Sequence, residues 1–312
     1  MQPISPMNGI SKPITHKDLK WYDFPKPDQS TIDFLAKKFK FHPLDLEDCL
    51  TEIQRPKIDE YPNYLFIVLH FPIWNQRIGR ITTEEVDIFI SQNFVVTLHN
   101  DALAPIEKIR TACQKKYGRE KYCGRGSGYF LYELTSELFD YCFPIIDKMW
   151  QQAGSIERDV FDQEGMRDLL KDIMLLKKNI ITFRRILQPE RPVISSLEHK
   201  NKKFLPEKLE AYFDDVVDKI EKQWNSLDSL KEVAETLQDA NESLISHRSG
   251  ETIKILTIFS VIMLPLTLIS GIFGMNVSLP LQESPTAFLT VSGVMLVTVI
   301  TMLAYFRWKK WW

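Results

Sequence analysis

The chain has 312 residues, which is enough for one large domain or two domains of ordinary size. Its 39 Lys and Arg residues nearly balance 41 Asp and Glu residues, so the formal charge of −2 excludes the basic bias of a general nucleic-acid-binding protein. The four cysteines show no C-x-x-C motif and no metal-ligand spacing, which predicts reduced thiols in a cytosolic domain; they are Cys49, Cys113, Cys123 and Cys142.

The first part of the chain, residues 1–125, mixes short strands and helices. It begins without a basic segment and apolar core, so no signal peptide is expected and the bulk of the chain should stay where it is made. The stretches "YLFIVLHFPIW", "EEVDIFIS" and "FVVTLHN" predict strands, with a hairpin turn at Gln92-Asn93 between the last two. The stretches "TIDFLAKKF" and "PIEKIRTACQKKYG" have helical spacing. We therefore expect an α+β cytosolic domain with a mixed or antiparallel sheet.

Residues 126–206 form a second region that is predicted to be a helical hairpin. The preceding "CGRGSG" (residues 123–128) favours a linker, since no Walker lysine-serine pair follows it to make a phosphate loop. Two long helical patterns follow, over residues 129–161 and 166–187, joined by a turn at Gly165. Pro189 and Pro192 should end the second helix.

A long stalk helix is predicted over residues 207–254. No proline occurs between Pro206 and Pro265, and apolar residues recur at steps of mostly three or four. If the whole proline-free run is one helix, it would be about 85 Å long at 1.5 Å per residue, and it should need partner helices and other copies of the chain to cover its apolar stripe. The alternative is a helix-bundle domain with a hidden break near residues 246–250.

Residues 255–312 hold two uncharged apolar runs, 255–273 and 287–306. Each is long enough to cross a hydrocarbon core of about 30 Å, so both predict transmembrane helices; buried core helices are the alternative. Lys and Arg flank the outer ends of the pair but are absent from the loop 274–286. This asymmetry predicts that both termini are cytoplasmic and that the loop is external.

Two helices cannot enclose a water-filled path, so a pore made by this chain would require a ring of copies. The first span carries a candidate pore face, in which successive members follow at steps of four, four, three and four: Leu256, Ser260, Leu264, Thr267 and Gly271. The Ser and Thr hydroxyls could instead bond to carbonyls of their own helix. Pro265 removes a backbone donor and would permit a bend.

Three stretches resemble the CorA family of magnesium channels, and the likeness covers nearly the whole chain. They are "LTIFSVIMLPLTLISGIFGMN", which ends in the family's Tyr/Phe-Gly-Met-Asn hallmark, "HPLDLEDCLTEIQRPKIDEYPNYLFIVLH" and "PEKLEAYFDDVVDKIEKQW". The resemblance implies a funnel-shaped homopentamer in the lipid of the inner (plasma) membrane. It also implies Mg²⁺ as permeant ion and regulatory ligand, tolerance of Co²⁺ and Ni²⁺, no prosthetic cofactor, no enzymatic activity and no nucleic-acid partner.

The resemblance also implies roles for individual residues. Gly274, Met275 and Asn276 would form the selectivity filter, where amide oxygens accept hydrogen bonds from the waters that Mg²⁺ gives up reluctantly. Leu256 and Leu264 would be hydrophobic constrictions, with Thr267 and Gly271 facing the pore. Asp239 would lie at the cytosolic entrance, and Asp48 and Asp215 would bind regulatory Mg²⁺ between neighbouring subunits. Without the family, the acids Asp45, Glu47 and Asp48 would belong to the first turn of a helix, and Gly-x-Asn would be a helix C-cap.

The outer loop departs from the family pattern. Ser278 and Gln282 stand where acids are common, and only Glu283 remains acidic, which weakens the expected concentration of cations at the mouth. Met275 favours magnesium over the related zinc transporters.

Two other functions stay open beside a magnesium channel. One is a Zn²⁺ transporter of the same superfamily, and the other is a non-conducting, membrane-tethered sensor or scaffold. An enzyme is the weakest alternative, because His42, His70 and His99 lack a paired nucleophile or metal-ligand spacing.

Overall fold

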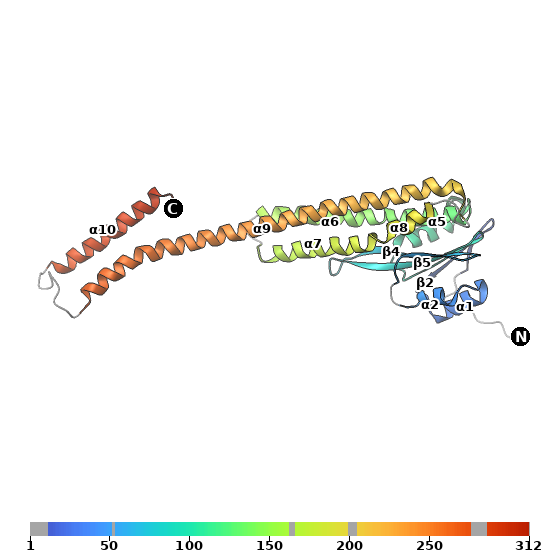
Figure 1. The fold of residues 1–312 in the computed structure, drawn as a ribbon, viewed down its shortest axis with the longest axis horizontal. Helices are drawn as coiled ribbons and strands as arrows, with labels where there is room; N and C mark the ends of the chain where they lie inside the picture. The colour runs from blue at the N-terminus through green and yellow to red at the C-terminus, as the bar shows by residue number, and fades with distance from the viewer. Residues whose placement is uncertain (1–11, 52–53, 162–165, 199–204, 276–285, 312) are drawn as a thin grey trace. The chain divides into compact units, whose positions relative to one another are not determined.

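The computed structural model describes residues 12–51, 54–161, 166–198, 205–275 and 286–311 (Figure 1). The chain divides into two compact units, Met1–Gln238 and Asp239–Trp312, and the helix α9 (Glu210–Phe273) runs through the division. Each unit is described by itself.

The first unit is built on a six-stranded mixed sheet, as the sequence predicts. The strand order is β1-β2-β6-β5-β4-β3, and all neighbours are antiparallel except β2 and β6. The hairpin turn predicted at Gln92-Asn93 is confirmed, with Ser91 N–H donating to the Phe94 carbonyl at 3.0 Å. The strands are β1 (Ile14–His16), β2 (Leu19–Pro25), β3 (Lys57–Glu60), β4 (Leu65–Asn75), β5 (Arg80–Ile90) and β6 (Phe94–His99).

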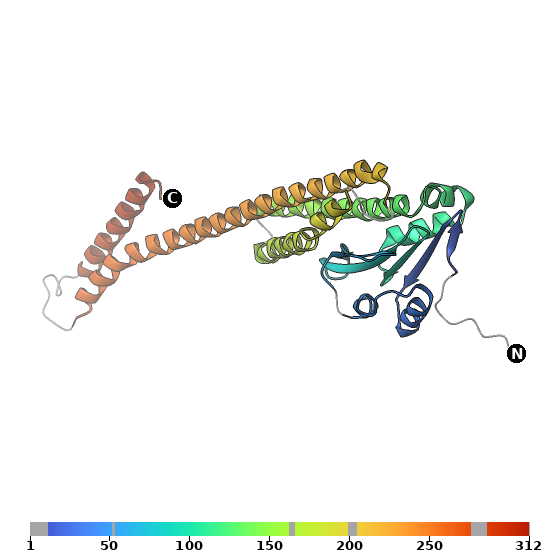
Figure 2. The same cartoon turned by 45° about the vertical axis from the view of Figure 1, so that its right-hand side comes forward.

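Helices cover both faces of this sheet because its strands are apolar on both sides. Helices α1 (Gln29–Phe39) and α2 (Pro43–Asp48) lie on one face, over a cluster that includes Phe24, Phe66 and Phe89. Helices α5 (Ser127–Asp140), α6 (Cys142–Phe161) and α7 (Met166–Leu187) lie on the other (Figures 1 and 2). Alternate residues of β2 face the two layers. Phe24 belongs to the cluster under α1 and α2, whereas Trp21 packs on Phe130 of α5 with ring centroids 4.9 Å apart.

The single helix predicted over residues 105–118 is wrong, because the chain turns back there. Helix α3 (Ala104–Cys113) ends, and α4 (Lys116–Cys123) begins after two intervening residues. At Gly118 a Cβ would lie 2.0 Å from the Ala112 carbonyl oxygen, so only glycine permits this close approach of the two helices. The predicted linker contributes a short connection to α5, in which Gly126 has a φ of 96°.

The predicted helix 129–161 is interrupted at Tyr141, which separates α5 from α6. Pro144 is the cause that the sequence offers, since it has no N–H to continue the hydrogen-bond ladder to the carbonyl of residue 140. The expected turn at Gly165 lies outside the described residues. After α7, Pro192 does not prevent a helix: it lies in the first turn of α8 (Glu190–Glu198), where a missing N–H is tolerated.

Helix α9 confirms the predicted stalk and excludes a break near residues 246–250. It follows a short 3-10 turn (Glu207–Leu209). The helix is 64 residues long in total and runs through Gly250 and Pro265 without interruption. Its apolar stripe finds the expected partner helices within the first unit. Trp150 of α6 donates through Nε1 to Ser226 at 2.9 Å, and Arg184 of α7 binds Asp228 at 2.5 Å.

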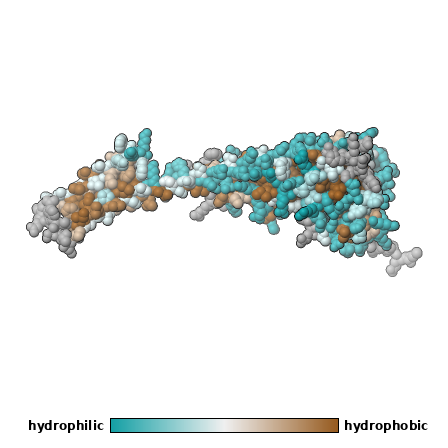
Figure 3. All heavy atoms as spheres, viewed as in Figure 1, coloured by the Kyte–Doolittle hydropathy of each residue, from teal (hydrophilic) through white to brown (hydrophobic). Residues whose placement is uncertain are grey.

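The second unit contains the end of α9 and α10 (Ala287–Trp308). Both helices are long and apolar enough to cross a membrane, and apolar side chains gather over them in Figure 3. None of the apolar window of either helix is buried within the chain. Such a surface needs lipid or protein to cover it.

Candidate functional site

The five residues predicted to line a pore lie on one face of α9. Leu256, Ser260, Leu264, Thr267 and Gly271 are all exposed, and at 100° per residue they fall within an arc of about 80°. Four of them, from Ser260 onward, also line one shallow groove that ends at Met275. The groove is an unbroken path along the helix in which only two positions carry a polar side chain.

The two hydroxyls on this face bond to their own helix, as the alternative interpretation predicts. Ser260 Oγ donates to the Leu256 carbonyl and Thr267 Oγ1 donates to the Met263 carbonyl, each at 2.8 Å. This does not conflict with a role toward an ion. With its proton used by the helix, each hydroxyl oxygen still has lone pairs that can accept hydrogen bonds from the water shell of a cation.

The end of α9 differs from the expected glycine turn. Gly274 N–H donates to the Ser270 carbonyl at 2.9 Å, and Met275 N–H donates to the Ile272 carbonyl at 3.3 Å. Among the described glycines, only Gly79 and Gly126 have positive φ, so backbone freedom is not what position 274 requires. A Cβ at Gly274 would lie 3.0 Å from the Ser270 oxygen, so a side chain there would require a small shift of the last turn. Asn276, Ser278, Gln282 and Glu283 lie outside the described residues.

The predicted regulatory acids lie on two separate elements. Asp48 is the last residue of α2, and its carboxylate binds Lys57 at 2.9 Å. Asp215 lies near the start of α9, 3.8 Å from Lys219, with a half-exposed side chain. Among the described residues the two carboxylates make no contact with each other within one chain. Asp239 is exposed on α9.

Lys57 is a fixed counter-charge for Asp48. Its Nζ also binds Asp59 at 2.7 Å. Burial acts to lower the pKa of Lys57, but hydrogen bonds to Asp59 and Asp48 outweigh it and raise the pKa above its ordinary value. Asp48 therefore keeps one oxygen engaged by an ammonium group that stays charged at neutral pH.

The three acids of α2 do not share one role, so the interpretation of all three as first-turn acids is wrong. The helix is only six residues long, so Asp48 is at its end, while Glu47 is exposed. Asp45 is buried and accepts hydrogen bonds at 2.9 Å from the phenols of Tyr61 and Tyr64. Burial raises the pKa of Asp45, although the two phenols act in the opposite direction. Asp45 anchors α2 to the sheet.

Sequence reasoning missed two buried acids, Asp87 on β5 and Glu190 at the start of α8. Their residues are 4% and 0% exposed, and one carboxylate oxygen of each has no hydrogen-bond partner among the described residues. Burial raises the pKa of each carboxyl group well above the ordinary value for its residue type. The available signal was a single acid within the apolar run "VDIFI", which is unusual in a central strand.

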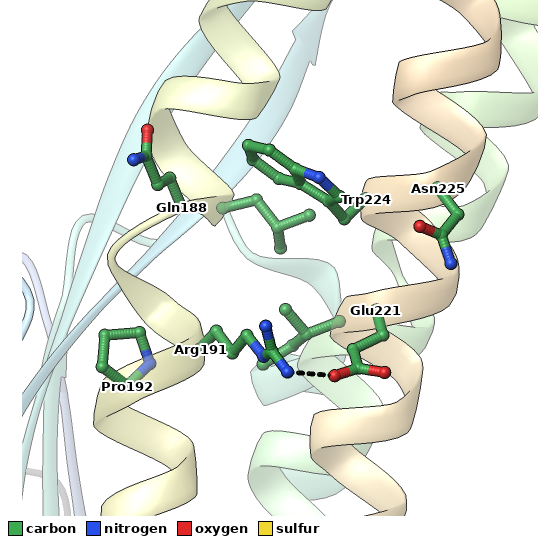
Figure 4. Close-up of a pocket in the computed structure, with 8 residues that line it drawn as sticks. Gln188, Arg191, Pro192, Glu221, Trp224 and Asn225 are labelled. Atoms are coloured by element: carbon green, nitrogen blue, oxygen red, sulfur yellow. Dashed lines mark hydrogen bonds and ion pairs between the residues drawn. The ribbon is translucent and has the colours of Figure 1, made fainter.

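A cleft of about 470 Å³ lies in the first unit between the α7–α8 junction and α9 (Figure 4). Figure 4 shows Arg191 reaching across it to form an ion pair with Glu221, below the indole of Trp224. The guanidinium of Arg184 lies 4.4 Å from the Trp224 ring centre and also binds Asp228. Each arginine is paired with an acid of α9, so the cleft is a junction that ties helices together.

The histidines and cysteines have structural partners. His42 caps α2 by accepting from Leu44 N–H at 3.3 Å, while His70 and His99 each lie 3.2 Å from a carboxylate, of Glu85 and Asp23 respectively. All four cysteines are free and buried. In the part of the chain that the structure describes, no three His, Cys, Asp or Glu side chains are grouped so that they could hold a metal ion.

Comparison with known proteins agrees with this architecture. The family profile described as "CorA-like Mg2+ transporter protein" matches residues 16–310. YfjQ of Bacillus subtilis is 32% identical over 312 residues, which cover 98% of this chain and 93% of that protein. The cobalt/magnesium transport protein CorA of Thermotoga maritima is 30% identical over 285 residues, covering 90% of this chain and 79% of that protein.

A solved structure matches the fold over nearly its whole length. The complete structure of the CorA magnesium transporter from Methanocaldococcus jannaschii has a TM-score of 0.84 at 24% identity, covering 98% of this chain and 93% of that one. The mixed sheet, the long stalk helix and the two C-terminal apolar helices are thus one known fold.

Proposed function

The chain belongs to the CorA-like Mg²⁺ transporter family, and from that premise we propose that it conducts Mg²⁺ into the cell through a ring of its own copies. Membership makes it a divalent metal ion transporter and not an enzyme, and an integral membrane protein with two C-terminal spans. The choice of Mg²⁺, the path and the gate are the proposal. In this proposal the protein lies in the inner (plasma) membrane, and both of its termini lie in the cytoplasm.

The single observation that carries the proposal is the exposed face of α9 that runs from Leu256 to Gly271 and ends beside Met275. Ser260 and Thr267 give this face two hydroxyl oxygens that can accept hydrogen bonds from water in a narrow path. One or two helices leave no lumen, so the face requires copies arranged about an axis. A pentamer is the assembly that the family implies. In that assembly α10 faces the lipid.

Ion selection takes place at the outer end of this path. A ring of Asn276 amide oxygens accepts hydrogen bonds from the inner waters of Mg²⁺, so the ion passes without losing its shell. A ring of carboxylates would hold the ion more tightly and slow its release. Gly274 lets the last turn of α9 pack closely before Met275, and Glu283 is the acid left in the outer loop to attract cations.

Gating follows from two features of the same chain. Leu256 and Leu264 form apolar rings that exclude water when the path is narrow, and Asp239 attracts cations at the cytosolic entrance. Internal Mg²⁺ bridges Asp48 of one copy and Asp215 of the next and holds the ring closed. Lys57 already engages Asp48, so Mg²⁺ must compete for that carboxylate, which sets the site to respond only to a high internal concentration.

The test is uptake of Mg²⁺ into liposomes that contain the purified full-length protein and a Mg²⁺-sensitive dye. We expect flux in the parent, loss of flux in Asn276→Ala, and little change in Ser278→Ala, a matched substitution in the same loop. Size-exclusion chromatography checks that both variants assemble. Equal flux in the parent and in assembled Asn276→Ala would remove the selectivity ring from the proposal.

Exchanging the ion distinguishes the other candidates in the same assay. Co²⁺ and Ni²⁺ should pass with Mg²⁺. Flux with Zn²⁺ and none with Mg²⁺ would indicate a zinc transporter instead. No flux with any ion would indicate a sensor or scaffold.

A further inference from the structure

A small polar cavity of about 140 Å³ lies inside the first unit, at the C-terminal end of α2. It is separate from the proposed bridge between Asp48 and Asp215. The described residues that line it include no lysine or arginine, and those that bear on its chemistry are Cys49, Thr51, Glu85, Asp87, His99 and Asn100. Its wall is therefore polar and acidic.

Asp87 is the unusual member of this wall. The residue is 4% exposed, and its Oδ1 has no hydrogen-bond partner among the described residues. The Cys49 thiol lies close to the carboxylate but donates to the Asp45 carbonyl at 3.1 Å. Burial raises the pKa of Asp87 well above its ordinary value, and the neighbouring Glu85 carboxylate adds to the shift. Buried carboxylates are normally paired or bound to a metal.

Glu85 brings a second carboxylate to the same cavity. It is two residues before Asp87 on β5, so both side chains point to the same face of the sheet. Glu85 Oε2 accepts from Gln54 N–H at 2.6 Å and lies 3.2 Å from His70 Nε2. These contacts leave its other oxygen, Oε1, without a hydrogen bond to any described residue. Two carboxylates thus offer unused oxygens to one small space.

The two nearby side chains that could neutralise these carboxylates, Lys57 and His99, are engaged by other partners. Lys57, which acts electrostatically on Asp87, is bound to Asp48 and Asp59 at 2.9 and 2.7 Å. His99 Nδ1 accepts from Asp101 N–H, so its proton is on Nε2, which faces Asp23. Both ring nitrogens of His99 are thus engaged by Asp101 and Asp23. A proton on Asp87 would also leave Oδ1 without a described acceptor.

We propose that this cavity binds a divalent cation through the carboxylates of Asp87 and Glu85, with water completing the coordination shell. Mg²⁺ suits such a site, since it takes oxygen ligands, is commonly held by one or two carboxylates and keeps several waters. At roughly 30 Å³ per water, the cavity has room for about four. Zn²⁺ suits it poorly, because no three His, Cys, Asp or Glu side chains of the described residues form a closed site.

The position of the site gives it a consequence for α2. Cys49, Leu50 and Thr51 follow Asp48 directly and form part of the cavity wall. An ion held beneath them would fix the end of α2 within a single subunit. This is a second internal cation site beyond the proposed function, and it needs no neighbouring copy.

The test counts bound Mn²⁺, a paramagnetic substitute for Mg²⁺, by electron paramagnetic resonance on the full-length protein in detergent. The parent for this test is Asp48→Asn/Asp215→Asn, which removes the proposed bridge between copies. We expect about one Mn²⁺ per chain that excess Mg²⁺ displaces, and a loss of affinity of more than about tenfold in Asp87→Asn and in Glu85→Gln. Asp33→Asn, an exposed acid on α1, should change nothing.

The melting temperature measured with and without Mg²⁺ gives a second readout, which also shows whether a variant is folded. Mg²⁺ should raise the melting temperature of the parent and leave that of Asp87→Asn unchanged, while without Mg²⁺ the variant should melt no lower than the parent. No displaceable Mn²⁺ in the parent, or equal binding in Asp87→Asn, would overturn the proposal and leave the cavity with water or a proton only. The readouts do not involve flux, so they stand whether or not the channel proposal holds.

Discussion

At the scale of single residues, the structure separates acids that can meet an ion from acids that hold the fold. Asp45 belongs to the second class because two phenols engage both of its oxygens. Asp48, three positions later, is partly exposed, and among the described residues its carboxylate is paired with Lys57 alone. From sequence spacing, both acids are expected in the same helix. Their different roles become visible only from the packing of Tyr61 and Tyr64.

Glu190 provides a test of a buried charge at this scale. Its Oε1 accepts from His70 N–H at 2.6 Å, and Oε2 has no partner among the described residues. Because burial raises its folded pKa above the ordinary value of 4.5, the folded protein binds this proton more tightly than the unfolded chain. The resulting stability is complete below about pH 4.5 and is lost as the pH rises through the folded pKa.

We expect Glu190→Gln to melt at a higher temperature than the parent at pH 8, because the amide still accepts from His70 and cannot ionise. The difference should shrink as the pH falls toward 5. Thermal unfolding of the full-length protein between pH 5 and pH 8 measures it, with Glu210→Gln, an exposed glutamate at the start of α9, as the control. A variant that melts lower at pH 8, or keeps the pH slope of the parent, would contradict this account.

At the scale of elements, α9 is the feature that joins the proposed regulatory acid Asp215 to the proposed pore face. It continues past Gly250, where an added Cβ would meet nothing within 4 Å, and past Pro265. The sequence left two interpretations of residues 246–250 open, since one glycine weakens a helix by only about 1 kcal/mol. The uninterrupted helical residues on either side decide in favour of continuity.

Substitutions at Gly250 test this continuity. Gly250→Ala should stabilise the helix by about 1 kcal/mol and leave flux and its inhibition by internal Mg²⁺ unchanged, since the methyl group meets no neighbour. Gly250→Pro should cost about 3 kcal/mol and remove the dependence of flux on internal Mg²⁺. Melting temperature and liposome flux at low and high internal Mg²⁺ measure both. Full Mg²⁺ inhibition in an assembled proline variant would show that the gate does not require an unbroken α9.

At the scale of the whole molecule, the proposed function depends on assembly. The apolar windows of α9 and α10 are entirely uncovered within one chain, and two helices enclose no path. In the proposed ring, the pore faces of the copies would face one another and the outer faces would contact lipid.

Mixing parent and Asn276→Ala chains tests the ring. If one defective copy is enough to block conduction, an equal mixture leaves about 3% of pentamers with five intact copies, and flux should fall to nearly that level. Flux of liposomes made from co-expressed chains measures the fraction, and native mass spectrometry counts the copies. A fall to only one half would mean that each chain, or each assembly of identical chains, conducts by itself.

The sequence by itself determined the spans, the stalk and the candidate pore face, because each depends on a local pattern: an uncharged run, a proline-free stripe, a repeat of three and four. It also carried the family motifs, since these are contiguous residues. It could not determine where α5 gives way to α6, because Pro144 is compatible with either a kinked helix or two helices until the packing chooses.

Only the tertiary structure decided which acids are buried and what surrounds them. Asp87 and Glu85 come from one strand, but the cavity that they face is also lined by residues that follow α2 and by the end of β6, far apart in the sequence. Burial and the lack of a partner are properties of that three-dimensional packing. For the same reason Lys57 could be recognised as the partner of Asp48 only after β3 had been placed beside α2.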